Sequence, residues 1–282
     1  MNLYQAKEVT KMLLEFKCSN HRSIKEKVSF SMIAGSDNTS EELLKKFGNF
    51  RILRSAVIYG ANGSGKSNFI SALSFMKDLV SNSINHQPGQ GVFQARHKLS
   101  AEETPSEYSI QFVRNDIRYA YGFSVKQNLI QDEYLYYFPR GRQVKVFERN
   151  GLDVRSGDRY KGVFDVSISI LKDNRLFLSC AANYSNIKEI EEAFMFFNTD
   201  IVVYNPEINN WTEYSIELMQ NNDMIKRVFV DMLRALGTGA KDVKVKLEKI
   251  KLTDLPQELQ LPDALKSLLG AREGNRIEAK VI

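Results

Sequence analysis

Residues 55–67 read SAVIYGANGSGKS, a short apolar segment that runs into a glycine-rich turn. The portion from Gly60 to Ser67 fits the pattern G-x-x-x-x-G-K-[ST], which forms a phosphate-binding loop between a strand and a helix. The apolar composition of Ser55–Tyr59 predicts a strand that is buried on both faces of a parallel sheet. A helix is predicted from Lys66 onward, because apolar residues recur there at helical spacing, namely Ile70, Leu73, Met76 and Val80.

Each residue type in this loop has a physical role in holding phosphate. Glycines adopt backbone conformations that other residues avoid, so that N–H groups come close to phosphate oxygens. The N-terminus of the helix adds unpaired donors and partial positive charge. Lys66 is predicted to reach the β- and γ-phosphates, and Ser67 to place its hydroxyl on Mg²⁺. The sequence therefore predicts ATP and Mg²⁺ as cofactors, with nucleotide contacts from Gly60, Ala61, Asn62, Gly63, Ser64, Gly65, Lys66, Ser67 and Asn68.

The composition is that of a folded globular protein, with 282 residues of which 43% are hydrophobic and 26% are charged. There is no run of 18 apolar residues, and residues 1–11 lack the apolar stretch of a secretion signal, so we expect a cytoplasmic protein without a membrane partner. The net charge of +5 would tolerate a polyanionic partner without requiring one. Packing or surface positions are expected for the cysteines and histidines, which match no disulfide framework or metal-ligand spacing: Cys18, Cys180, His21, His86 and His97.

In the rest of the chain, segments with the period-two pattern of strands alternate with segments that have the apolar spacing of helices. Strands are predicted by period-two patterns at residues 12–16, 27–33, 133–138, 144–148 and 241–250, and by a hairpin that turns at Asn115-Asp116. Helices are predicted at residues 174–182 and 187–197, with a buried strand at 201–204 after them. A later helix, ended by Gly237 and Gly239, has one apolar stripe made of Ile225, Phe229, Leu233 and Leu236.

These patterns predict an α/β fold with a mixed sheet. We expect a flexible extension at residues 1–11, a P-loop core at 12–105, an antiparallel β subdomain at 106–170 and a helical region at 171–240. Residues 241–282 are expected to begin a second lobe. The last seven residues alternate apolar and charged side chains like a strand that has only begun, so we expect the chain to stop inside a fold.

The sequence resembles the ATPase heads of the SMC, RecF and OLD-like group, which are ABC-type ATPases. The resemblance rests on the phrase Ser19-Asn20-His21-Arg22-Ser23-Ile24 together with GANGSGKSN. It is closest to the AAA-family, RloA-like ATPases of bacterial phage-defence and abortive-infection operons, through segments between Met12 and Ile250 that read LLEFKCSNHRSI, SAVIYGANGSGKSN, YSIQFVRNDIRYAYGFSV, RLFLSCAAN and DIVVYNP.

The resemblance implies a P-loop ATPase head, of which this chain is the N-terminal lobe. It places Arg22 near the bound nucleotide, whereas the family more often has an aromatic residue at the position of His21, which is left without a role. It also implies ATP-dependent dimerisation through the nucleotide site and a partner effector in anti-phage defence. A surface arginine in a turn is the plainer interpretation of Arg22.

The resemblance also implies parts that the sequence lacks. ABC-type heads carry a hydrophobic strand that ends in Asp-Glu, which holds Mg²⁺ and activates water, and a signature segment that completes the partner's site. Ile201–Tyr204 leads instead into Asn205-Pro206-Glu207, and Phe229-Val230-Asp231 lies within the predicted helix. We therefore assign no catalytic residue and expect the chain to bind ATP but to hydrolyse it poorly, because positioning and electrostatics supply nearly all of phosphoryl-transfer catalysis.

Two other functions stay open at this point. One is a regulatory module that holds nucleotide without hydrolysing it; the other is a DNA-repair or chromosome ATPase of the RecF or SMC type. Nucleic acid is only weakly supported as a partner. Two groups of residues, one of aromatic and basic side chains and one of lysines, are as readily explained as exposed residues of a turn and of a strand. They comprise Tyr136, Tyr137, Phe138, Arg140, Arg142, Lys145 and Arg149, and Lys241, Lys244, Lys246, Lys249 and Lys251.

Overall fold

The computed structural model describes residues 10–36, 41–204, 211–250 and 274–281. The chain forms two units, Met1–Val203 and Tyr204–Ile282. The first unit contains a seven-stranded sheet whose pairings are all antiparallel. Its strands lie in the order β2-β1-β5-β6-β7-β8-β9. Their bounds are β1 Lys11–Ser19, β2 Val28–Ser31, β5 Ser106–Arg114, β6 Ile117–Lys126, β7 Leu129–Phe138, β8 Val144–Asn150 and β9 Asp153–Ser156.

Tight turns set the register of the central strands. Asn115 and Asp116 connect β5 to β6 with φ angles of 49° and 60°, the positive values that a two-residue hairpin turn requires. Asparagine and aspartate tolerate this conformation better than most residues. The predicted hairpin is therefore confirmed. Gln127 and Asn128 make the corresponding turn between β6 and β7, with φ angles of 50° and 63°.

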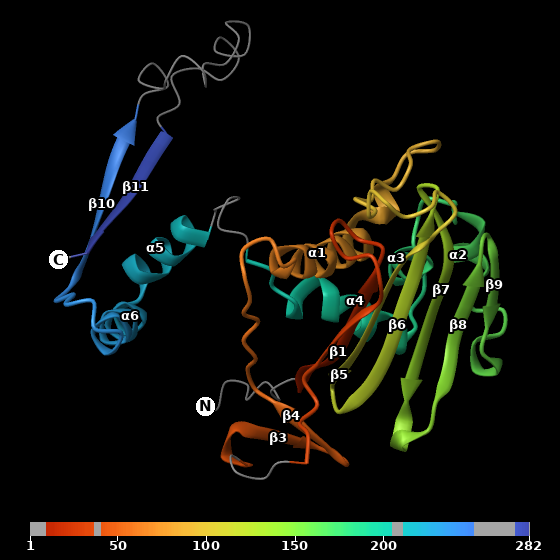
Figure 1. Cartoon of the computed structure of the whole chain (residues 1–282), viewed down its shortest axis with the longest axis horizontal. Coiled ribbons are helices and arrows are strands. Elements are labelled where there is room, and N and C mark those ends of the chain that lie inside the picture. Colours follow the sequence, from red (N-terminus) through yellow and green to blue (C-terminus); the bar gives the residue numbers. More distant parts are fainter. Residues whose placement is uncertain (1–9, 37–40, 205–210, 251–273, 282) are drawn as a thin grey trace, which may run out of the picture. The chain divides into compact units, whose positions relative to one another are not determined.

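Helices cover one face of this sheet, as Figure 1 shows for α1, α3 and α4. Phe69 and Met76 of α1, Phe177 of α3 and Ile190 of α4 share one buried cluster with strand residues such as Phe112. This packing is the core of the first unit. The helices are α1 Lys66–Asn82, α2 Asp165–Ser169, α3 Phe177–Tyr184 and α4 Lys188–Met195, with shorter turns η1 Glu41–Leu43, η2 Ser83–Asn85, η3 Pro139–Gly141, η4 Asp158–Tyr160 and η5 Phe196–Asp200.

A buried carboxylate attaches α3 to the sheet. Glu133 of β7 accepts hydrogen bonds from the backbone N–H groups of Phe177 (2.5 Å) and Leu178 (2.9 Å) at the start of α3, and from the Tyr121 hydroxyl (2.9 Å). The oxygen that accepts from Phe177, Oε2, also pairs with Arg149 at 3.3 Å, and both side chains are completely buried. Burial raises the pKa of Glu133, whereas Arg149 and the backbone donors act in the opposite direction. The side chain thus replaces a local cap for α3.

The prediction of a buried parallel strand at Ser55–Tyr59 is wrong for the described structure. These residues are extended but belong to no strand, and the side chains of Val57 and Tyr59 are 84% and 90% exposed. Their composition fits a strand, yet no described strand lies beside them to pair with their backbone groups. For the same reason the described strands form no mixed sheet.

A further expectation differs from the structure. Residues 201–204 form no strand, and Val202 and Tyr204 are exposed, again without a neighbouring strand among the described residues. The strands from residue 106 onward are antiparallel, as expected, and β5 pairs with β1 from Lys11 to Ser19, so that they continue the sheet that contains β1.

The predicted helix after the loop is confirmed, and most of the expected stripe faces the core. Met76 and Val80 are fully buried and Leu73 is partly buried against the core, whereas Ile70 is exposed. Phe69, Ala72 and Leu79 complete the buried face. No described helix is both long enough and apolar enough to cross a membrane.

The second unit consists of short elements. The described ones are α5 Trp211–Asn221, α6 Asp223–Ala235, β10 Val243–Ile250 and β11 Gly274–Val281. β10 and β11 pair antiparallel, and Ile216, Met219, Val230 and Val243 form a small buried cluster. The predicted helix and strands of this region are present, and Gly237 and Gly239 follow α6 with positive φ angles of 70° and 73°. A separate hairpin of the first unit joins β3 Leu44–Phe47 to β4 Phe50–Leu53.

The predicted flexible extension at residues 1–11 falls mostly outside the described residues, since only Thr10 and Lys11 are placed. β1 begins at Lys11 and runs to Ser19, one residue before the predicted start and three beyond the predicted end.

Candidate phosphate-binding site

The glycine-rich loop leads directly into the N-terminus of α1. Gly65 is the N-cap residue with a φ angle of 94°, and Gly63 has a φ angle of 80°. These are left-handed conformations that glycine adopts without strain. No side chain caps the first turn of α1, so its backbone N–H groups are not taken by a local acceptor. An anion is the natural ligand for such a helix start.

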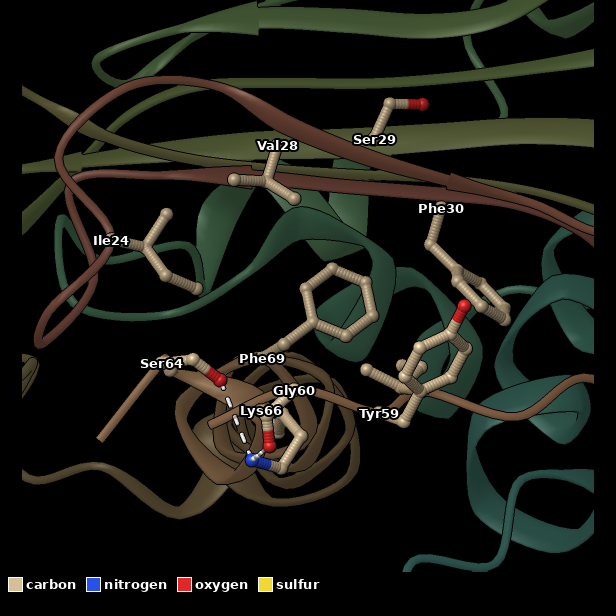
Figure 2. Close-up of a pocket in the computed structure, with 11 residues that line it drawn as sticks. Ile24, Val28, Ser29, Phe30, Tyr59, Gly60, Ser64, Lys66 and Phe69 are labelled. Atoms are coloured by element: carbon tan, nitrogen blue, oxygen red, sulfur yellow. Dashed lines mark hydrogen bonds between the residues drawn. The ribbon is translucent and has the colours of Figure 1, made fainter. Parts of the chain in front are cut away.

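The Lys66 ammonium group lies within the loop. It donates to the backbone oxygens of Gly60 (2.7 Å) and Ala61 (2.8 Å) and contacts the Ser64 hydroxyl at 3.4 Å. Figure 2 shows the side chain turned back toward the loop backbone, with dashed lines to Gly60 and Ser64. The Lys66 ammonium group is therefore held by oxygen atoms of the loop, in a position to bind a phosphate group there.

The remaining loop residues are arranged around this cation. Asn62 is exposed at the tip of the loop, and the Ser64 N–H donates to the Ala61 oxygen at 3.2 Å to close a turn. Ser67, in the first turn of α1, is exposed, so its hydroxyl is accessible to a metal ion. Asn68 differs from the others, because its amide donates to the Ser23 hydroxyl at 2.7 Å.

Arg22 lies in the turn that carries Ser23, beside the start of α1. Its φ angle is 50°, its N–H donates to the Ala95 oxygen at 2.6 Å, and its side chain is exposed. The structure thus places the turn from the N-terminal phrase next to the glycine-rich loop, although 45 residues separate Ser23 from Asn68.

A cavity of about 390 Å³ opens beside the loop. Its walls combine the loop with apolar side chains from β2 and from the segments next to it, and Figure 2 shows Phe69 and Phe30 among the residues that line it. The two rings lie 5.7 Å apart between centroids. The residues around the cavity are Ile24, Val28, Ser29, Phe30, Ile58, Tyr59, Gly60, Ser64, Gly65, Lys66 and Phe69.

Sequence reasoning did not assign these apolar residues to the site. The period-two pattern did place Val28 and Phe30 on one face of a strand, and both side chains line the cavity. That shared face was the available signal. No residue around the cavity is Asp or Glu, so the described part of the chain offers the loop hydroxyls but no carboxylate to a metal ion here.

His21, which the resemblance left without a role, is a buried packing residue. Its ring nitrogens lie 2.9 Å from the Tyr108 hydroxyl and 3.3 Å from the Ser71 hydroxyl of α1. Burial lowers the pKa of His21 to about 4, and the neighbouring Arg22 charge adds to this effect. The imidazole is therefore neutral at physiological pH and connects β5 to α1.

The two cysteines have no part in the site. Cys18 and Cys180 are free and buried, so both occupy packing positions. Burial raises the pKa of Cys18 to about 11 and that of Cys180 to about 12, so both thiols stay protonated. Within the described residues, no group of three or more His, Cys, Asp or Glu side chains could hold a metal ion.

The mixed group around β7 and β8 does not form one surface. Arg149 is completely buried against Glu133, and Tyr137 is buried with its hydroxyl bonded to Arg159. Lys145 pairs with a glutamate of its own strand, at 3.0 Å. Tyr137 and Arg149 are thus not available on the surface, whereas Arg140 and Arg142 of the same group are exposed. In the second group, Lys251 lies outside the described residues.

No acidic pair follows a buried strand in the described part of the chain. Ile201–Tyr204 forms no strand and its side chains are exposed or partly buried, and Asn205-Pro206-Glu207 lies outside the described residues. Asp231 lies within α6, as the sequence predicted, and pairs with Arg234 at 3.3 Å.

Residues 55–161 match the family model described as "AAA domain, putative AbiEii toxin, Type IV TA system". The matched span includes the glycine-rich loop, α1 and strands β5 to β9, and amounts to less than half of the chain. It supports an AAA-type, P-loop nucleotide-binding domain in the first unit. A comparison with curated proteins finds no match.

Proposed function

We propose that this chain is the ATP-binding N-terminal lobe of an ABC-type ATPase. The observation that carries the proposal is the Lys66 ammonium group, held by backbone oxygens inside a glycine-rich loop at an uncapped helix N-terminus. This arrangement presents one cation and several N–H donors to a single point, which suits a triphosphate. The match to an AAA-type family model agrees with it.

The residues around the loop suit the other parts of a nucleotide as well. The base would lie in the apolar cavity, against Phe30 and Phe69, because aromatic and aliphatic side chains favour a flat heterocycle. Ser67 would supply a hydroxyl to Mg²⁺, an ion that usually takes few protein ligands and completes its shell with phosphate oxygens and water. When bound, Mg²⁺ would neutralise charge on the β- and γ-phosphates.

Turnover by this chain alone is proposed to be slow. No carboxylate lines the cavity to hold the metal ion or to position water, and those tasks supply most of the catalysis in phosphoryl transfer. The full activity would require an acidic strand and a signature segment supplied from elsewhere. The exposed, strand-like Ser55–Tyr59 supports this, since its apolar residues would be buried by such an addition.

The proposed biological role is anti-phage defence, in the cytoplasm. ATP would close a homodimer around the nucleotide site, and that closure would gate a partner effector. The support for this role is the resemblance to phage-defence ATPases and the wording of the matching family description, which names a toxin of a toxin–antitoxin system.

A titration with a fluorescent ATP analogue and Mg²⁺ tests the binding proposal. Lys66→Ala should weaken binding about 10- to 100-fold, the range expected when one charge-assisted hydrogen bond to phosphate is lost. Lys161→Ala removes an exposed cation after β9 and should bind like the wild type. Equal affinities for the wild type and Lys66→Ala would refute the proposed site. Phosphate release measured on the same samples should be slow.

A further inference from the structure

The turn Asn20–Ile24 contacts α1 through side-chain hydrogen bonds: the buried His21 ring lies 3.3 Å from the Ser71 hydroxyl, and Ser23 meets Asn68 near the start of the helix. The Asn68 amide donates to the Ser23 hydroxyl at 2.7 Å. The same hydroxyl lies 3.2 Å from the point that a Cβ atom on Gly65 would occupy, so turn and loop are in close approach. Asn68 is therefore engaged with the turn and not with the centre of the glycine-rich loop.

The turn itself is rigidly built. Asn20 is buried, and its side chain accepts from the His97 N–H (3.1 Å) and donates to the Thr104 oxygen (2.9 Å). Asn20 and Arg22 both have left-handed φ angles, of 51° and 50°, which few residues other than glycine adopt. Such a conformation persists only where surrounding contacts impose it. Contacts with the loop at residues 92–104 thus hold the turn in one conformation.

The opposite side of the turn faces the proposed nucleotide site. Ile24 lines the same cavity as Gly65 and Lys66. Arg22 is exposed, and no described carboxylate forms an ion pair with its guanidinium group. Arg22 and Ile24 therefore flank Ser23, and the contact between Ser23 and Asn68 links this part of the turn to the start of α1.

We propose that Asn68 is a positioning residue for the nucleotide site. Its hydrogen bond to Ser23 holds the turn so that Arg22 and Ile24 form a second wall opposite Lys66, while the Asn68 side chain itself does not touch phosphate. The inference rests on the proposed function and adds a specific prediction to it: Ser23, Asn68 and Arg22 act on ATP affinity as one unit.

A double-mutant cycle on the full chain tests this, with calorimetric titration of Mg·ATP. Asn68→Ala and Ser23→Ala should each weaken binding about fivefold, the effect of one neutral hydrogen bond, and the double variant should be no weaker than either single variant. Ser23→Thr keeps the hydroxyl and should restore wild-type affinity. Ser74→Ala, an exposed serine on the same helix, is the control and should bind normally.

A second cycle pairs Arg22→Ala with Asn68→Ala, and the loss from Arg22→Ala should be smaller when Asn68 is already absent. Without nucleotide, each variant should unfold at the wild-type temperature, because Ser23 and Asn68 meet at the surface. A purely structural role would lower that temperature and leave affinity at the wild-type value.

Three results would overturn the inference. They are wild-type affinity in Asn68→Ala, losses from Ser23→Ala and Asn68→Ala that simply add, or a loss in Asn68→Ala without one in Ser23→Ala, which would mean that Asn68 touches the nucleotide directly. Failure of the wild type to bind ATP would instead sink the proposed function, so the two failures are distinguishable.

Discussion

At the scale of single residues, His21 shows how the chain uses a polar side chain in its core. The ring bridges Tyr108 on β5 and Ser71 on α1, and it packs edge-on against the tyrosine ring at 5.8 Å. A neutral imidazole can accept one hydrogen bond and donate another, whereas the phenyl ring of phenylalanine has no N–H or O–H group to donate and no nitrogen or oxygen to accept. The same buried ring makes the stability of the first unit sensitive to pH.

His21 should make the protein less stable as the pH falls from about 6.5 to about 4. The folded protein holds the pKa of this histidine near 4, whereas the ordinary value is 6.5, so in that window the unfolded chain binds a proton that the folded protein does not. Above pH 6.5 the contribution is fully present. Urea unfolding across this range should show a smaller pH dependence in His21→Phe than in the wild type.

The control for this measurement is His97→Gln, which should keep the wild-type pH dependence. His97 lies in the loop before β5 and bonds only with neighbouring residues of that loop through its ring. If His21→Phe and the wild type lost stability equally between pH 6.5 and 4, the assignment of a neutral, buried His21 would be wrong.

At the scale of elements, the buried ion pair of Glu133 on β7 and Arg149 on β8 belongs to a network that also binds the first N–H groups of α3. Arg149 also donates to the backbone oxygens of Gly151, Lys172 and Arg175. Glu133→Ala should lower the free energy of unfolding by about 3 to 5 kcal/mol, because it leaves a buried guanidinium without its partner and the first N–H groups of α3 without acceptors. Chemical denaturation measures the loss.

Glu148→Ala is the matched control on the neighbouring strand. Glu148 pairs with Lys145 in a half-exposed position, so its loss should change stability by less than about 1 kcal/mol. Similar losses in Glu133→Ala and Glu148→Ala would show that the buried network does not hold α3 on the sheet.

The extended segment Ser55–Tyr59 gives a second prediction at this scale. Because the Val57 side chain is exposed, Val57→Asp should change the unfolding free energy of this chain by no more than about 0.5 kcal/mol. If Val57 lay instead in a strand buried in a parallel sheet, Val57→Asp would lower the free energy of unfolding by several kcal/mol, because an unpaired carboxylate would be buried. Ile52→Asp, at a buried position of β4, supplies the comparison and should be strongly destabilising.

At the scale of the whole molecule, sequence patterns of a few residues predicted the features of the fold that depend on a few neighbouring residues. The glycine-rich loop, α1 and the turn at Asn115-Asp116 are all where the sequence placed them, because glycine content, helical spacing and turn preference act over a few residues. The family match over residues 55–161 agrees with the P-loop assignment.

What the sequence did not predict depends on partners distant in the chain. Ser55–Tyr59 has the composition of a strand, but pairing needs a neighbour that the described residues do not supply. The apolar cavity combines β2 with α1, and the contact of Ser23 with Asn68 joins residues 45 positions apart. The spacing of apolar residues along the chain does not indicate which distant segments contact one another. The residues that line the cavity beside the loop all belong to the first unit.

Calorimetric titration of the folded wild-type chain with Mg·ATP tests the central claim most directly, since the backbone amides around Gly65 and the Lys66 ammonium group are proposed to bind a triphosphate. The account predicts saturable heat that fits a single site and that is strongly reduced in Lys66→Ala. Absence of binding heat at any temperature tried, from protein shown to be folded by circular dichroism, would contradict it.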